Sequence, residues 1–327
     1  SKNLESYQLK KVSILDPSIL SYNLGNEIIL NSIDHFISEH LNESFVIKLQ
    51  YTERLRKKSK NHIKNSDLAI LAGTNSLSSN MFCLEQFPIQ PFDLISINNI
   101  LLCGVGWFQY QNKPNLINSS ILKILLRKDM THSVRDSYTK KMLNSIGINN
   151  VVNTSCPTVW NITPDHLATI PDSKAKYVVT TLTDYNKDTV LDSKLLEILD
   201  SNYEKVFFWP QGLGDYEYLM QLVQNIKINL EIISPNLRSF DFILENEDID
   251  YVGTRLHAGI RAIQKSVRAF VVTIDNRAKE ISKDIHLNAT ERLNVDLLKN
   301  FINAKTENNL VIPYKQIDDW KSQFRDF

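Results

Sequence analysis

IDYVGTRLHAGIRAIQKSVRAFVVTI (residues 249–274) contains two short apolar runs separated by a stretch whose apolar residues recur at helical spacing. The runs at 249–253 and 268–274 are apolar at most positions, which is typical of parallel strands buried on both faces. The spacing across 256–265 predicts a helix. The segment therefore predicts a β-α-β unit, the building block of a parallel sheet.

The rest of the second half repeats this alternation of strand and helix. Further strands are predicted at 177–182, 205–210 and 230–234, and further helices at 190–200, 215–227 and 238–247. Four crossovers in succession indicate one parallel sheet with helices on both faces.

The first half shows a similar succession. Strands at 11–15 and 45–50 flank a helix predicted at 26–41, whose isoleucine, leucine and phenylalanine residues fall on one helical face. The remaining strands are predicted at 68–74, 100–107, 130–136 and 150–155, with a helix before the last strand that ends at Gly147.

The fold class predicted from this pattern is α/β, with two Rossmann-like domains facing each other across a cleft. A chain of 327 residues exceeds the length at which one hydrophobic core usually stops growing. We expect an N-terminal domain at 1–160, a C-terminal domain at 161–312, and a terminal helix at 313–327 that packs back on the first domain. Ligands of such sheets bind outside the carboxyl ends of the strands.

The composition is that of a folded protein without a global electrostatic field. Hydrophobic residues make up 43% and charged residues 23%, and 37 basic residues balance 37 acidic ones. This balance argues against a nucleic-acid partner, so any anion site must be local. Cys83, Cys103 and Cys156 are widely spaced, which suits reduced thiols in a cytoplasmic protein. No signal peptide or apolar run approaching about 18 residues is seen, so we expect a cytoplasmic protein.

Arg255 and His257 lie at the end of the strand predicted at 249–253, where a helix begins. Backbone N–H groups and the helix dipole favour an anion at such a position. Arg255 could hold a phosphate or carboxylate through two parallel hydrogen bonds, and His257 could add a third or carry a proton. In the alternative interpretation Thr254 caps the helix, Arg255 pairs with an acid such as Asp250, and His257 is an interior histidine.

Arg135 occupies a similar position in the first half, at the end of a predicted strand. Asp136 or Ser137 could cap the following helix. If the cleft forms, Arg135 and Arg255 could approach each other from opposite domains. The alternative is a salt bridge from Arg135 to Asp136 or Asp129.

Three loops of the first half could present polar or aromatic groups to a ligand. SYNLGNEIIL (21–30) follows the first strand, and there Gly25 allows a tight turn, Asn26 caps the helix, and Asn23, Asn26 or Glu27 could reach a ligand. Gly73 lies at another strand end. Trp107 could stack on a sugar face, or it could be a core tryptophan.

RLRKKSKNHIK (54–64) carries six Lys or Arg residues and no acidic residue. A solvated helix face is the ordinary interpretation of such a run. The alternative is a contact with an anionic membrane surface or a lipid pyrophosphate.

Together these segments resemble the polysaccharide pyruvyltransferase family over nearly the whole chain. The resemblance rests on NLGNEIIL, LAGTN, GVGW and SVRDSYTKKMLNSIGI, and most specifically on DYVGTRLHAGIRAI followed by VVTIDNRAKEI. It implies a fold like that of the GT-B glycosyltransferases and transfer of the pyruvyl group from phosphoenolpyruvate to hydroxyls of a sugar, forming a cyclic ketal. The acceptor would be a cell-surface polysaccharide or its lipid-linked precursor at the inner face of the membrane.

The resemblance also implies roles for the candidate residues. Those expected to bind phosphoenolpyruvate are Arg135, from the N-terminal domain, and Arg255, Leu256 and His257, from the C-terminal, donor side. Arg135, Arg255 and His257 would be catalytic, and our own hypothesis is that His257 acts as general acid. Those expected on the N-terminal, acceptor side are Asn23, Gly25, Asn26, Glu27, Gly73 and Trp107. No metal or cofactor is expected.

This chain departs from the family pattern at two places on the acceptor side. It has Gly25-Asn26 where the family usually has Gly-Asp, and Ala72-Gly73-Thr74 where the family has a richer glycine run. Two other functions therefore stay open: a GT-B glycosyltransferase that uses a nucleotide sugar, and a non-catalytic relative that binds glycan.

Overall fold

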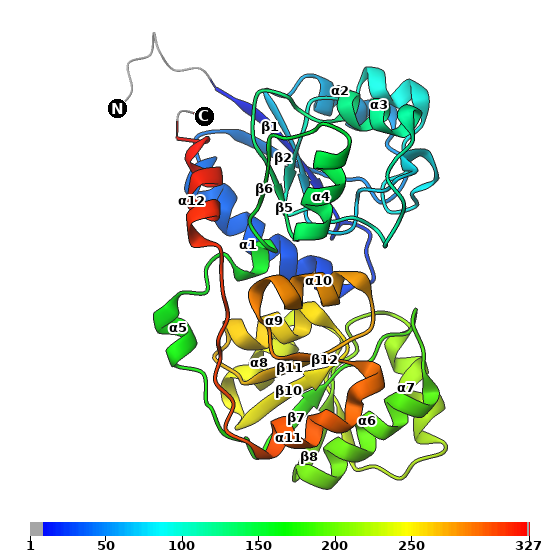
Figure 1. Cartoon of the computed structure of the whole chain (residues 1–327), viewed down its shortest axis with the longest axis vertical. Helices are drawn as coiled ribbons and strands as arrows, with labels where there is room; N and C mark the ends of the chain where they lie inside the picture. Colours follow the sequence, from blue (N-terminus) through cyan, green and yellow to red (C-terminus); the bar gives the residue numbers. More distant parts are fainter. Residues whose placement is uncertain (1–8, 326) are drawn as a thin grey trace. The chain divides into compact units, whose positions relative to one another are not determined.

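The computed structural model describes residues 9–325 and 327, and its chain divides into two compact units (Figure 1). Unit 1 comprises the chain up to Leu20, then Leu30–Trp160 and Pro313–Phe327. Unit 2 comprises Ser21–Ile29 and Asn161–Ile312. Residues 21–29, which we had assigned to the N-terminal domain, therefore belong to the unit formed by the second half of the chain.

Unit 2 is built on a parallel sheet of six strands in the order β12-β11-β10-β7-β8-β9. Its strands are β7 (Tyr177–Thr180), β8 (Lys205–Phe208), β9 (Leu230–Ile232), β10 (Ile249–Gly253), β11 (Ala269–Thr273) and β12 (Ala289–Glu291). The short β12 was not predicted. From β7 the chain adds strands first on one side of the sheet and then, from β10, on the other. The order reverses between β7 and β10, and this switch point is where ligands bind in open parallel sheets.

Four helices of unit 2 lie close to the positions predicted at 190–200, 215–227, 238–247 and 256–265, and its other helices, at 164–168, 276–285 and 298–303, were not predicted. In chain order the helices are α5 (Pro164–Ala168), α6 (Thr189–Asn202), α7 (Asp215–Val223), α8 (Leu237–Asn246), α9 (Leu256–Gln264), α10 (Asn276–Ile285) and α11 (Leu298–Asn303). All five residues of β10 and of β11 are buried, as their apolar sequences predict.

Unit 1 contains a parallel sheet of four strands, β2-β1-β3-β4, and a separate parallel pair, β5-β6. The strands are β1 (Lys11–Asp16), β2 (Phe45–Gln50), β3 (Leu68–Ala72), β4 (Ile100–Cys103), β5 (His132–Val134) and β6 (Val151–Asn153). The helices with residues in this unit are α1 (Leu24–His40), which begins in unit 2, α2 (Lys57–Lys64), α3 (Leu116–Leu125), α4 (Ser137–Ser145) and α12 (Tyr314–Ser322). β3 is buried throughout, whereas the edge strand β2 is partly exposed.

The predicted terminal helix is present as α12 and packs within unit 1. Trp320 donates a hydrogen bond of 2.7 Å from Nε1 to the Thr131 carbonyl. Its ring centroid lies 5.2 Å from that of Phe36 and 5.4 Å from that of Trp160. This aromatic contact joins the end of the chain to the core of unit 1.

The α/β class and the two parallel-sheet, Rossmann-like units are confirmed. Within the described residues, no helix is both long enough and apolar enough to cross a bilayer.

Candidate functional site

The candidate site lies in unit 2, where β7 and β10 end at the switch point of the sheet. Arg255 follows β10 and occupies the N-cap position of α9. Its backbone N–H donates to Thr181 Oγ1 at 3.1 Å, which ties the start of α9 to the end of β7. The Thr254 hydroxyl bonds Thr183 Oγ1 at 2.8 Å and does not cap the helix, so the predicted Thr254 cap is wrong.

The Arg255 side chain is 3% exposed and is held by two carboxylates. Its Nε donates to Asp215 Oδ2 at 3.0 Å and to the Leu182 carbonyl at 3.1 Å. Its Nη2 donates to Asp184 Oδ1 at 3.1 Å and to Asp215 Oδ1. The guanidinium is therefore fixed in direction, and among the described residues no group accepts a hydrogen bond from Nη1.

Asp250, which the sequence suggested as an ion-pair partner of Arg255, pairs with a different residue. Arg268 donates to Asp250 Oδ1 at 3.1 Å from Nε and to Oδ2 at 2.5 Å from Nη2. Asp250 is near the start of β10 and Arg255 follows its end. Unit 2 thus contains two buried arginine-carboxylate pairs, and the pair near the start of β10 lies away from the candidate site.

Asp215 is the buried anchor of Arg255, and sequence reasoning missed it. It begins α7 and is 0% exposed, and its carboxylate also accepts the N–H groups of Gly212 at 2.8 Å and Asp184 at 3.2 Å. Burial raises the pKa of Asp215, whereas Arg255 and the Gly212 N–H act to lower it. A signal for Asp215 was present in the sequence. Gly214-Asp215 lies at the start of the helix after β8, in the same way that Gly253 and Arg255 lie next to the start of the helix after β10.

His257 and Leu256 lie in the first turn of α9 and are 3% and 2% exposed. The backbone around them is held in place because Tyr251 donates from its hydroxyl to the Arg255 carbonyl at 2.7 Å. Burial raises the pKa of the Tyr251 phenol well above its usual range. Because the Leu256 side chain is apolar and buried, only the backbone of Leu256 could contact a polar ligand. The His257 imidazole is also buried.

The loop around Gly25, assigned to the acceptor side of the N-terminal domain, instead contacts the loop that follows β8. Asn23 Oδ1 accepts 3.0 Å hydrogen bonds from Gln211 Nε2 and from the Gly25 N–H. A Cβ on Gly25 would lie 2.7 Å from Gln211 Nε2, and one on Gly212 would lie 2.5 Å from Arg255 Nη2. Asn23 is therefore connected to Arg255 through Gln211 and Gly212, inside unit 2.

Asn23 also caps α1. The prediction that Asn26 caps this helix is wrong. Asn23 Oδ1 accepts the Gly25 N–H at 3.0 Å, and the Asn26 N–H donates to the Asn23 carbonyl at 3.0 Å. The Asn26 side chain donates from Nδ2 to Ser21 Oγ at 2.9 Å. Glu27, in the first turn, is exposed.

Tyr185, Asp275 and Arg277 form a second polar cluster beside Arg255. The Arg255 Cζ lies 5.1 Å from the ring centroid of Tyr185, whose side chain is 57% exposed. The Tyr185 hydroxyl accepts from Arg277 Nη2 at 2.8 Å and donates to Asp275 Oδ2 at 3.1 Å. Asp275 caps α10, after β11. A second guanidinium therefore lies at the same edge of the sheet, and sequence reasoning had not named it.

Arg135 belongs to unit 1, at the end of β5, and is 0% exposed. Its Nε lies 3.7 Å from Asp136 Oδ2, and Asp136 caps α4 by accepting the Thr139 N–H at 2.7 Å. Asp129, the other suggested partner, instead pairs with Arg127 at 2.8 Å. The Arg135 guanidinium is therefore buried beside the start of α4.

The two remaining acceptor candidates, Gly73 and Trp107, also lie in unit 1. Trp107 is 1% exposed within the hydrophobic core and donates from Nε1 to Gln111 Oε1 at 2.8 Å. Stacking of Trp107 on a sugar is therefore a wrong prediction, because core side chains cover its ring. Gly73, after β3, has a φ of 56° and donates its N–H to the Cys103 carbonyl at 2.9 Å.

Comparison with known proteins places these observations in a family. The model of the family described as polysaccharide pyruvyl transferase matches residues 23–276, which include the Gly25 loop and the Arg255 network. No curated protein matches the chain.

Two solved structures are similar to this chain at low sequence identity. UDP-GlcNAc 2-epimerase of Methanocaldococcus jannaschii, in complex with UDP-GlcNAc and UDP, has a TM-score of 0.51 at 12% identity, covering 97% of this chain and 100% of that chain. UGT89C1 of Arabidopsis thaliana, complexed with UDP, has a TM-score of 0.48 at 9% identity, with coverage of 97% and 100%. The first likeness supports a fold of the GT-B kind.

Proposed function

The chain belongs to the polysaccharide pyruvyl transferase family, and from this premise we propose that it transfers the pyruvyl group of phosphoenolpyruvate to two hydroxyls of a saccharide. The observation that carries the proposal is the Arg255 network. A guanidinium fixed by Asp215 and Asp184 lies at the switch point of a parallel sheet, beside the N-terminus of α9. A helix N-terminus at such a position favours an anionic ligand.

Phosphoenolpyruvate carries a carboxylate and a phosphate on one small frame, so its binding needs several fixed donors. Arg255 Nη1 and the N–H groups of the first turn of α9 are the donors that we assign to it. Because Asp215 and Asp184 already engage Nε and Nη2, Arg255 would need little reorganisation to meet the ligand. A donor role for Arg135, which is fully buried in unit 1, stays a prediction.

His257 is the proposed general acid. A proton delivered to the methylene carbon turns it into a methyl group and leaves C2 cationic, so a first sugar hydroxyl can attack C2. Phosphate then leaves with cleavage of its bond to C2, and a second hydroxyl attacks the same carbon to close the ketal. The two hydroxyl protons balance the reaction: one replaces the proton that His257 gave, and the other leaves with phosphate.

The acceptor is proposed to bind near the Gly25 loop, which reaches the Arg255 network through Gln211. Asn23 and the exposed Glu27 are the polar side chains that this loop can offer to a sugar. Glu27 is a candidate base for a sugar hydroxyl. We further propose that the saccharide belongs to a cell-surface polysaccharide or its lipid-linked precursor.

Thermal unfolding with and without phosphoenolpyruvate tests the donor assignment, with two variants compared. A ligand that binds only the folded protein raises the unfolding midpoint. Arg255→Ala and Arg268→Ala each remove one partner of a buried ion pair, so both should lose roughly 3–5 kcal/mol of stability. Only Arg255→Ala should also abolish the shift caused by phosphoenolpyruvate. Arg255→Lys, which keeps a cation, provides the comparison if Arg255→Ala does not fold.

The two alternative functions give different results in the same experiment. A nucleotide-sugar glycosyltransferase would be stabilised by UDP and not by phosphoenolpyruvate; UDP is bound in the similar epimerase structure. A non-catalytic relative would be stabilised by glycan but would release no phosphate when phosphoenolpyruvate and a saccharide are both present. Loss of the phosphoenolpyruvate shift in Arg268→Ala as well would reject the Arg255 assignment.

A further inference from the structure

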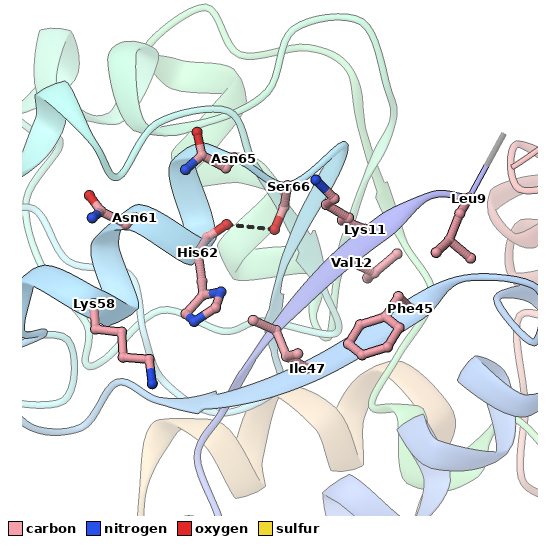
Figure 2. Close-up of a pocket in the computed structure, with 10 residues that line it drawn as sticks. All are labelled: Leu9, Lys11, Val12, Phe45, Ile47, Lys58, Asn61, His62, Asn65 and Ser66. Carbon is pink, nitrogen blue, oxygen red and sulfur yellow. Dashed lines mark hydrogen bonds between the residues drawn. The ribbon is translucent and has the colours of Figure 1, made fainter.

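A pocket of about 640 Å³ lies in unit 1 between α2 and the strands β1 and β2, apart from the residues of the candidate site (Figure 2). α2 and the residues that follow it contribute Lys58, Asn61, His62, Asn65 and Ser66. The other lining residues are Leu9, Lys11, Val12, Phe45 and Ile47. No aspartate or glutamate is among these ten residues.

The floor of the pocket is formed by apolar side chains of β1 and β2 and of Leu9, which precedes β1. Lys11 is opposite Phe45 and Ser13 is opposite Ile47 in this parallel pair. Residues two apart on a strand point to the same face, so Phe45 and Ile47 lie on one face of the edge strand. Phe45 is 62% exposed and Leu9 is 51% exposed. An apolar surface of this kind, left open at a sheet edge, is a candidate binding surface.

The wall of the pocket is polar and basic. Figure 2 shows the side chains of Lys58 and His62 directed from α2 toward β2. Ser66 Oγ donates to the His62 carbonyl at 2.7 Å and so fixes the end of this helix. A ligand that enters the pocket would therefore meet apolar groups on β2 and cationic or polar groups on α2.

The basic run at 54–64 supplies further cations near this pocket. Its exposed cations are Arg54, Arg56, Lys57, Lys58 and Lys64. Within residues 9–325, none of these five forms an ion pair. Lys60 differs, because it forms an ion pair with the buried Asp93 and so links α2 to the segment around Asp93. The exposed cations are thus available to a partner outside the chain.

We propose that this pocket and the exposed cations of residues 54–64 bind the surface of a bilayer that contains anionic phospholipid. The headgroup phosphate would lie against Lys58 and its neighbours, and the first methylene groups of the acyl chain would lie on Phe45 and Ile47. Charge complementarity selects this partner, because basic residues near an anionic bilayer each contribute about 1 kcal/mol. The proposal does not depend on the transfer reaction.

A second copy of this chain is the other candidate, because β2 is at the edge of the four-stranded sheet formed by the described residues. Two copies meeting at β2 would bring the exposed cations of residues 54–64 near one another. Repulsion between these like charges disfavours such a dimer. The same feature favours a partner of opposite charge.

Co-sedimentation with vesicles tests the proposal. The full chain should sediment with vesicles of equal parts phosphatidylglycerol and phosphatidylcholine, but not with phosphatidylcholine alone. Replacing Lys57 and Lys58 together by Gln should weaken binding about fivefold for each charge removed. Phe45→Ser should weaken it by on the order of tenfold, and this loss should persist at high salt because it removes apolar contact.

Matched variants elsewhere in unit 1 are the controls. Leu116→Ser removes an apolar side chain that is 88% exposed on α3, and Lys123→Gln with Lys128→Gln removes two exposed cations. These should bind vesicles as the wild type does. Equal losses in the controls, or equal binding to phosphatidylcholine alone, would overturn the proposal. So would a dimer in sedimentation velocity that Phe45→Ser dissociates, since it would identify β2 as a self-association edge.

Discussion

Arg255 and Asp215 form a buried ion pair across the switch point of the unit 2 sheet. The Arg255 Nε lies 3.0 Å from Asp215 Oδ2, and the two residues are 3% and 0% exposed. They are 40 residues apart in the chain, where Asp215 begins α7 and Arg255 is the N-cap of α9. The pair joins the loop after β8 to the start of α9, so each residue positions the other.

Asp215→Asn should destabilise the protein and impair transfer. The variant leaves the Arg255 guanidinium buried with less negative charge, and breaking a buried pair costs about 3–5 kcal/mol. Urea unfolding measures this loss. Asp184→Asn is the control, because the Asp184 side chain is 34% exposed and its pairing should contribute no more than about 1 kcal/mol. Similar losses in both variants would mean that Asp215 is not the main anchor.

His257→Gln should lower turnover far more than affinity for phosphoenolpyruvate. Glutamine keeps a hydrogen-bonding side chain but cannot deliver a proton, and general acid catalysis typically contributes about 100-fold to 10,000-fold. Steady-state release of phosphate gives kcat, and the thermal shift gives donor affinity. Near-normal turnover would remove His257 from the acid role and leave it as an interior histidine.

Asn23→Ala should cost about 1 kcal/mol of stability, because it removes the N-cap of α1. It also removes the acceptor for Gln211 Nε2, so the loop around Gly25 should become less ordered. We expect a smaller cost for Asn26→Ala, whose side chain bonds Ser21 Oγ and does not cap. Denaturant unfolding measures the loss of stability in each variant. A larger loss for Asn26→Ala than for Asn23→Ala would mean that Asn26 is the N-cap of α1 after all.

Stability should fall on acidification because of His132 in unit 1. Its Nδ1 accepts the Leu102 N–H at 3.2 Å and its Nε2 lies 2.8 Å from the Arg127 carbonyl, which suits a neutral ring. Burial lowers the pKa of His132 from 6.5 to about 4. Between these pH values the unfolded chain binds a proton that the native state does not.

The free energy of unfolding should therefore decrease as the pH falls from about 6.5 to about 4, by roughly 3 kcal/mol at the lower end. Above pH 6.5 this contribution should be constant. Urea unfolding at a series of pH values measures the slope. His132→Gln should show a smaller slope in this range, and an unchanged slope would mean that other groups cause it.

The fold could be predicted from the sequence because the signals that define it are local. Apolar runs such as 249–253 and 268–274 became the buried strands β10 and β11, and the helical spacing between them became α9. Every predicted strand is present. The missed strand β12 is three residues long and only partly buried, so it leaves no clear apolar pattern.

The site could be predicted only in part. The positions of Arg255 and His257 could be predicted because they follow an apolar strand and begin a helix, which is a pattern within a few residues. Asp215 was missed and Trp107 was misassigned, because burial and ion pairing depend on neighbours that are distant in the chain.

The sequence by itself determined the two parallel sheets and the position of Arg255 at the end of β10. Only the tertiary structure decided that Asp215 holds Arg255, that Asp250 pairs with Arg268, and that Asn23 meets Gln211, 188 residues away. The physical reason is that hydrophobic periodicity acts between near neighbours in the chain. The choice of ion-pair and hydrogen-bond partners follows from the order of the strands, which brings distant loops to one edge of the sheet.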